Sequence, residues 1–142
     1  MTQIDFYTHV DNKLLTACVL TAKALARNMK VVIYAPDRTT GAQIDNLLWS
    51  HPPIGFMPHC RATDPLAAGT PVIIAHEAAL GDNLPHDELL LNLHAEQPSF
   101  FSRFSRLIEI VGHDETDKQQ ARARWRHYHD HGYEIRTHQL GK

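Results

Sequence analysis

The residues best suited to chemistry lie near the end of the chain, in the segment KQQARARWRHYHDHGY between Lys118 and Tyr133. This segment combines regularly spaced cations, one indole ring and a run of histidines. Such residues could hold a metal ion, contact a nucleic-acid backbone or receive an acidic peptide. The choice depends on whether the segment is a helix, because a helix decides which side chains share a face.

The metal interpretation rests on the histidines, of which the chain has 11. On a helix His127 and His131 are four residues apart and share a face, whereas His129 points elsewhere, so three ligands do not converge. A third ligand could come from His59 or Cys60, but no H-E-x-x-H or C-x-x-C spacing supports this. Histidines near the carboxyl end of a helix are also stabilised by its dipole. We therefore expect a structural role for them, with no metal and no other cofactor.

The cations form the stronger candidate site. Asp114 can cap the start of the helix, and Gly132 can end it. At 100° per residue, several side chains between these two residues fall within one narrow arc. The residues of this arc are Lys118, Arg122, Trp125 and His129, with Arg126 just beside them.

A solvated charged face is the ordinary interpretation of such a stripe, but it does not require the indole of Trp125. A pocket for an acidic peptide with a hydrophobic end requires both parts, because guanidinium groups pair with carboxylates and an aromatic ring packs against the apolar residue. Single-stranded DNA could use the same parts through stacking and phosphate contacts. Ala121 and Tyr128 fall on the neighbouring arc and are the expected core contacts, which places Trp125 at the boundary with solvent.

A second candidate surface surrounds Trp49 and Phe56. The segment that follows Trp49, SHPPIGFMPHC, contains three prolines and a glycine, which favour an exposed, irregular stretch. Rigid aromatic side chains on such a stretch are typical of a protein-binding surface. Trp49 also ends an amphipathic helix and could simply cover a sheet, so both interpretations stay open.

The elements that position these residues alternate between strand and helix. Apolar patterns predict strands at IDFYTHV, KVVIYAP, TPVIIAH, ELLLNL, RLIEIV and YEIRTHQL. Helical spacing predicts one helix after a cap at Asp11, a second after a cap at Asp37, and a short helix around PSFFSRF. This order predicts a single α/β domain over residues 1–142, with a mostly parallel sheet and helices on both faces in a Rossmann-like or P-loop-hydrolase-like layering.

Several function classes are disfavoured by composition and motifs. The formal net charge of -2 argues against a protein that holds duplex DNA by bulk electrostatics. Neither G-x-G-x-x-G nor G-x-x-x-x-G-K-[ST] occurs, so the expected fold lacks a phosphate-binding loop, and no G-x-S-x-G motif marks a nucleophile. With Cys18 and Cys60 as the only cysteines and no apolar run of membrane length, we expect a cytoplasmic, non-enzymatic protein with reduced thiols and no membrane contact.

The chain resembles the chi subunit family of bacterial DNA polymerase III over essentially its whole length. The resemblance rests on IDFYTHV, KVVIYAPD, IDNLLWSHPPIGFMPHC, TPVIIAHE, LLLNLHAEQPSFFSRFSRLIEIV and DKQQARARWRHYHDHGYEI. It implies an α/β fold similar to nucleotide hydrolases without their phosphate loop, and a non-enzymatic adaptor of the clamp loader in DNA replication.

The same resemblance implies two protein partners. One side of the family's members binds the acidic C-terminal tail of single-stranded DNA-binding protein, and another side binds the psi subunit, which tethers chi to the clamp loader. By position, the residues expected to receive the tail are Lys118, Arg122, Trp125 and Arg126, with Arg122 pairing with its carboxylate. Trp49 and Phe56 would face psi, and DNA would be met only indirectly.

Two other functions compete with the adaptor. A direct single-stranded nucleic-acid-binding protein would use the same basic helix and would bind naked strands with strong salt dependence. A metal-dependent hydrolase would instead require stoichiometric zinc. The adaptor explains the fold without a phosphate loop, the cationic stripe with its indole, and the aromatic loop together.

Overall fold

The computed structural model describes residues 2–50, 59–61, 69–75, 84 and 86–140. Within these ranges the strands form one seven-stranded sheet in the order β3-β4-β2-β5-β6-β1-β7, and every adjacent pair is parallel. The strands are β1 (Gln3–Thr8), β2 (Val31–Tyr34), β3 (His59–Arg61), β4 (Val72–Ala75), β5 (Leu89–Asn92), β6 (Arg106–Ile110) and β7 (Ile135–Gln139). The predicted parallel sheet is confirmed.

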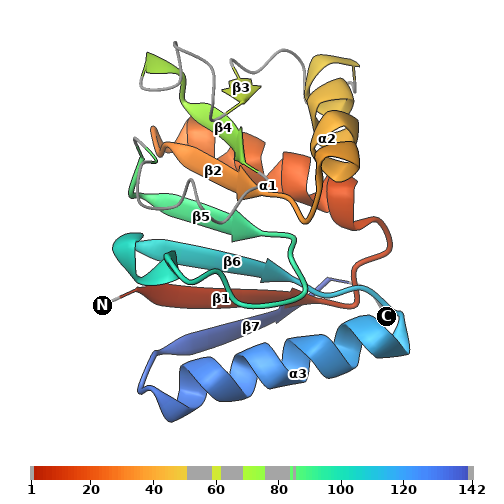
Figure 1. Ribbon diagram of the computed structural model, residues 1–142, viewed down its shortest axis with the longest axis vertical. Coiled ribbons are helices and arrows are strands. Elements are labelled where there is room, and N and C mark those ends of the chain that lie inside the picture. The colour runs from red at the N-terminus through yellow and green to blue at the C-terminus, as the bar shows by residue number, and fades with distance from the viewer. Residues whose placement is uncertain (1, 51–58, 62–68, 76–83, 85, 141–142) are drawn as a thin grey trace.

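Helices cover both faces of the sheet, as the alternating pattern predicted. The described helices are α1 (Lys13–Ala26), α2 (Arg38–Ser50), α3 (Glu115–Asp130) and a 3-10 turn, η3 (Phe101–Arg103), which replaces the short helix expected there. Side chains of α1 and α2 join the core on one face, whereas those of η3 and α3 join the core on the other. In Figure 1, α2 lies toward the β3 edge and α3 runs beside β7 at the opposite edge.

The helix caps agree with the sequence in all but one case. The Asp37 carboxylate accepts a 2.7 Å hydrogen bond from the Thr40 amide at the start of α2. The cap of α1 is Asn12 and not the expected Asp11, because the Asn12 side chain accepts from the Leu15 amide at 3.1 Å.

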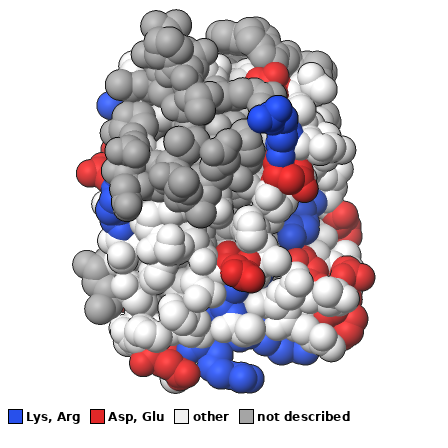
Figure 2. All heavy atoms as spheres, viewed as in Figure 1, with Lys and Arg blue, Asp and Glu red and all other residues white. Residues whose placement is uncertain are grey.

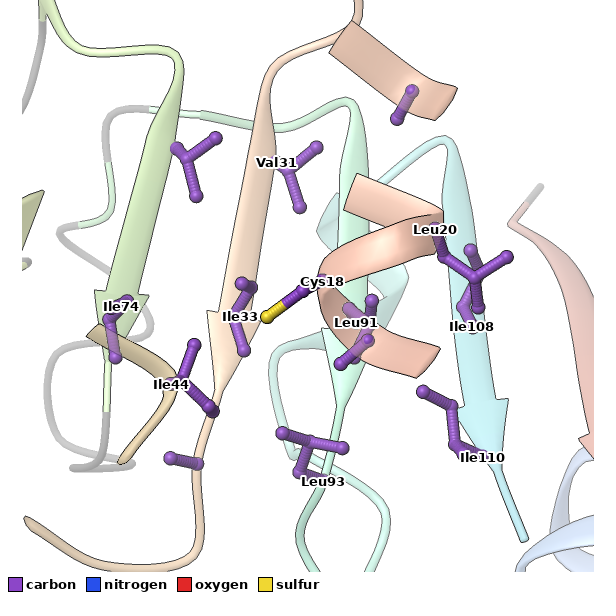
Figure 3. Packing of buried hydrophobic residues seen from close by; sticks show 14 of the residues in the cluster. Cys18, Leu20, Val31, Ile33, Ile44, Ile74, Leu91, Leu93, Ile108 and Ile110 are labelled. Carbon is purple, nitrogen blue, oxygen red and sulfur yellow. The ribbon is translucent and has the colours of Figure 1, made fainter. Parts of the chain in front are cut away.

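The core under α1 and α2 is aliphatic. Figure 3 shows Cys18 pointing from α1 toward the sheet, near Ile33 and Leu91, among side chains that are almost completely buried. This burial raises the pKa of the Cys18 thiol to about 11. Both cysteines are free thiols.

The strand β3 was not expected from the sequence. His59 to Arg61 pair with β4 as a short edge strand. A three-residue strand that follows a proline-rich segment carries too little pattern to be recognised. The preceding segment 51–58, predicted to be irregular, lies outside the described residues.

Candidate functional site

Helix α3 is fixed to the sheet by a buried polar network. The Arg124 Nε donates to Glu109 Oε1 at 3.0 Å, and the Arg124 Nη1 donates to the Ala95 carbonyl at 2.6 Å. The Tyr128 hydroxyl donates to Glu109 Oε2 at 2.6 Å, and the Asn92 amide reaches the same carboxylate. Glu109 on β6 thus accepts hydrogen bonds from two residues of α3. These bonds fix the orientation of the helix about its own axis.

Burial sets the protonation of this network. Glu109 is completely buried, and the loss of water raises the pKa of its carboxyl despite the opposing effects of Arg124, Tyr128 and Asn92. Burial, together with the Glu109 charge, also raises the pKa of Tyr128. Tyr128 therefore keeps its proton and remains a hydrogen-bond donor at neutral pH.

The start of α3 is tied to the opposite side of the sheet. The Asp114 side chain caps the helix by accepting from the Asp117 amide at 3.1 Å, as predicted. Asp117 accepts from the Gly112 amide at 2.7 Å and forms a 3.1 Å ion pair with Lys13 of α1. At the other end Gly132 has a φ of 81°, the left-handed conformation expected of a glycine that ends a helix.

Helix α3 and the neighbouring strands border a pocket of about 340 Å³, which we call the α3 pocket. Three of the four predicted tail-binding residues line it: Lys118, Arg122 and Trp125. Arg126 is exposed on the same helix but does not line the pocket. The 3.6-residue period grouped these three residues, and the structure places them on one wall of a pocket with Arg126 outside it, while their role in tail binding stays a prediction.

The remaining walls come from strands that the helical pattern could not reveal. Phe6 and Thr8 of β1 line the pocket, with Val111 after β6 and Thr137 of β7. His9 also lines it, with a φ of 58°, and its Nδ1 lies 3.0 Å from the Thr8 hydroxyl oxygen. A single histidine at a strand end carries no motif, so sequence reasoning missed it.

The exposed side chains of α3 are arranged for an aromatic and ionic contact. Trp125 is 40% exposed, and its ring stacks on His129 with 4.8 Å between ring centroids and 11° between planes. Arg122 lies 3.6 Å from the Glu115 carboxylate two turns earlier, and both side chains are mostly exposed. Such an exposed pair is weak, so Arg122 can exchange Glu115 for another carboxylate.

Figure 2 shows basic atoms along the lower edge of the molecule, over α3, with acidic atoms toward both ends of the helix. The cationic part is thus a small patch on a chain of net charge -2. A patch of this size suits one short anionic segment better than a long polyanion.

The histidines do not assemble into a metal site in the described part of the chain, where no group of three or more His, Cys, Asp or Glu could hold an ion. His127 and His131 share a face as predicted, with 4.3 Å between ring centroids, and the His131 Nδ1 lies 2.7 Å from the His127 carbonyl oxygen. The considered third ligand, His59, lies 2.9 Å from the Asp45 carboxylate.

Most of the second predicted surface lies outside the described residues. Phe56 and the side chain of Trp49 lie outside the described residues, so their assignment to a psi-binding surface stays a prediction. The backbone of Trp49 belongs to the last turn of α2. Figure 1 places α2 and α3 at opposite edges of the sheet.

The fold and the α3 pocket together define an α/β domain with a pocket rimmed by cations. None of the described helices has the length and apolar character needed to cross a bilayer. The sequence also matches a known family: the family model described as "DNA polymerase III chi subunit, HolC" matches residues 1–136.

Curated relatives agree with this match. The DNA polymerase III subunit chi of Pseudomonas aeruginosa is 33% identical over 99% of this chain and 98% of the relative. The subunit chi of Haemophilus influenzae is 33% identical over 96% of each chain, and that of Escherichia coli is 26% identical over 84% of this chain and 80% of the relative. The chain belongs to the DNA polymerase III chi subunit family, which serves DNA replication, and the resemblance found in the sequence is confirmed.

Proposed function

We propose that this protein is a non-enzymatic adaptor that receives the acidic C-terminal tail of single-stranded DNA-binding protein in the α3 pocket and links it to the clamp loader through psi. The observation that carries the proposal is the meeting of Lys118, Arg122 and the half-exposed Trp125 around one pocket. Cations and an aromatic wall are the two parts that a carboxylate next to an apolar residue requires.

The interior of the α3 pocket supports a ligand with an apolar end. Phe6, Val111 and Ala121 offer carbon surface at its walls, while Lys118 and Arg122 offer donors. An apolar terminal side chain would displace water from these walls, and its carboxylates would pair with the cations. The Trp125 ring, stacked on His129, is already held in one orientation and loses little entropy on binding.

The bridging part of the proposal rests on the separation of the two surfaces. The end of α2, which carries Trp49, and the α3 pocket lie at opposite edges of the sheet in Figure 1. A tail on α3 and a psi subunit bound near the end of α2 would therefore not compete for space. Trp49→Ala should weaken capture of the host's psi subunit in a pull-down while leaving tail binding unchanged; unfolding of this variant would indicate that Trp49 is a core residue instead.

The direct test is a titration with a fluorescently labelled peptide copying the C-terminal tail of the host's single-stranded DNA-binding protein, followed by anisotropy. We expect saturable binding that weakens when the C-terminal carboxylate is amidated. Arg122→Ala should cost about 1.5–3 kcal/mol, or roughly tenfold to a hundredfold in Kd, because a charge-assisted hydrogen bond is lost. The matched control is Arg38→Ala, which removes an exposed arginine from α2 and should bind normally.

Two outcomes would overturn the proposal. Unchanged affinity in Arg122→Ala would show that the tail binds elsewhere. Absence of peptide binding together with retention of a bare oligo-dT strand would assign the α3 face to single-stranded nucleic acid, a function that Trp125 could serve by stacking.

A further inference from the structure

A second pocket lies on the other face of the sheet, and the proposed adaptor function does not use it. This pocket, which we call the α1 pocket, has a volume of about 400 Å³. Its walls come from α1 and Met29 after it, from β1, β5 and β6, and from Leu140 just beyond β7. Tyr7 lines it, whereas its neighbours Phe6 and Thr8 line the α3 pocket, so the pleat of β1 separates the two pockets.

The α1 pocket exists because the helices on this face stop short of the sheet edge. The core under α1 and α2 extends over β2, β4, β5 and β6. Tyr7 only packs partly against this core, and its ring stacks on His138 of β7 at 4.6 Å. The side chains of α3 join the core on the other face, so α3 does not cover Tyr7 and His138 on this side.

Large apolar side chains remain exposed at this place. Among the described residues the exposed large hydrophobics are Val19, Leu140 and Trp125. Trp125 borders the α3 pocket, while Val19 at 38% and Leu140 at 54% exposure both border the α1 pocket. Exposed apolar surface that is grouped around a pocket marks a binding site more often than scattered residues do.

Cations stand beside this apolar surface. Leu15, Val19, Lys23 and Arg27 follow one another at intervals of four, so the α1 ridge changes from aliphatic to cationic along one side of the pocket. Lys23 and Arg27 are exposed, and neither forms an ion pair within the described part of the chain.

The floor adds a third cation. The Arg106 Nη2 donates to the buried Asp5 carboxylate at 2.9 Å, and Asp5 also lies 3.1 Å from His138. The Arg106 Nε is buried and has no hydrogen-bond partner among the described residues. Asp5 is the only carboxylate in these contacts. The pocket therefore has an excess of two positive charges, from the three cations Lys23, Arg27 and Arg106.

We propose that the α1 pocket is a second docking site, which takes an acidic segment of a partner protein with a large apolar side chain next to its carboxylates. The apolar side chain lies against Val19 and Leu140, and the carboxylates face Lys23 and Arg27. The positive charge of the pocket requires a ligand of negative charge. The aliphatic wall favours a peptide over a nucleic acid, because phosphates and sugars would leave that wall without an apolar partner.

The experiment is mapping by amide chemical shifts on the full-length, isotope-labelled chain. The probes are capped pentapeptides with one leucine or phenylalanine flanked by aspartates, and a matched set with lysines in place of aspartates. The chain carries Arg122→Ala, so that binding at the α3 pocket is weakened and failure of the proposed tail function does not affect the result. Arg27→Ala is added as the test variant, and Arg38→Ala as the control with the same change in charge.

We expect the aspartate peptides to shift amides around Val19, Arg27 and Leu140, with at least fivefold weaker binding in the Arg27→Ala chain and no change in the Arg38→Ala chain. The lysine peptides should produce no shifts there. The proposal is overturned if millimolar aspartate peptides leave these amides unmoved, or if both arginine variants bind equally. It is also overturned if only phosphatidylglycerol vesicles or oligo-dT perturb the α1 pocket, because a membrane or a nucleic acid would then be its ligand.

Discussion

Replacement of Arg124 by methionine tests how α3 is held in place. Arg124 is 2% exposed and makes one hydrogen bond to the Glu109 carboxylate and one to the Ala95 carbonyl. Methionine fills much of the same space without either donor. The change would therefore leave a completely buried carboxylate without its cation and a carbonyl without a donor.

The expected cost follows from that loss. Breaking a buried ion pair by removing one partner costs about 3–5 kcal/mol. Total stabilities of single domains are about 5–15 kcal/mol, so Arg124→Met should remove a large share of the free energy of unfolding. For a chain of this length the midpoint of thermal unfolding should fall by about 10–20 °C.

The assay is urea and thermal unfolding, with two further variants. Arg126→Met changes the exposed arginine two residues later and should alter stability by less than about 0.5 kcal/mol. The double variant Glu109→Gln with Arg124→Met removes both charges and should regain part of the loss, because no uncompensated buried charge remains. An Arg124→Met chain within 1 kcal/mol of the unaltered protein would refute the role assigned to the network.

Two further predictions concern burial and competition. Burial raises the pKa of Cys18 from 9.0 to about 11, so the folded state favours the protonated thiol; this stability is fully present below pH 9 and is lost as the pH rises through 11. Between pH 8 and pH 10.5 the loss should be about 2 kcal/mol, and urea unfolding under reducing conditions should show a smaller alkaline loss in Cys18→Ala. At the α3 pocket, Glu115→Gln should strengthen tail binding by about 0.2–1 kcal/mol, because the exposed carboxylate that competes for Arg122 is removed; an unchanged or weaker Kd by anisotropy would contradict this.

Much of the fold could be predicted from the sequence because its signals are local. The apolar run at Val31–Tyr34 and the alternation at Gln3–Thr8 correspond to strands, and the caps at Asp37 and Asp114 bound the helices that were expected. The same period placed Lys118, Arg122 and Trp125 on one wall of a pocket. These inferences depend on spacings within a single element.

Features made by distant segments could not be predicted in this way. Arginine is rarely buried, and the burial of Arg124 depends on Glu109, a residue of a different element 15 positions away. His9 enters the α3 pocket from the end of β1, 109 residues before Lys118. No spacing within α3 reveals either contact, since both require the packed sheet.

The buried side of α3 determines where its exposed side chains lie. The side chains that face inward, Arg124 and Tyr128, meet a fixed carboxylate on β6 and allow the helix only one rotation. That rotation brings Arg122 and Trp125 to the pocket wall. A helix held only by aliphatic contacts could turn or slide at small cost, because apolar packing has no direction. The buried ion pair therefore contributes most through the position of the exposed residues, which is why a substitution at Arg124, remote from any ligand, should also weaken binding in the α3 pocket.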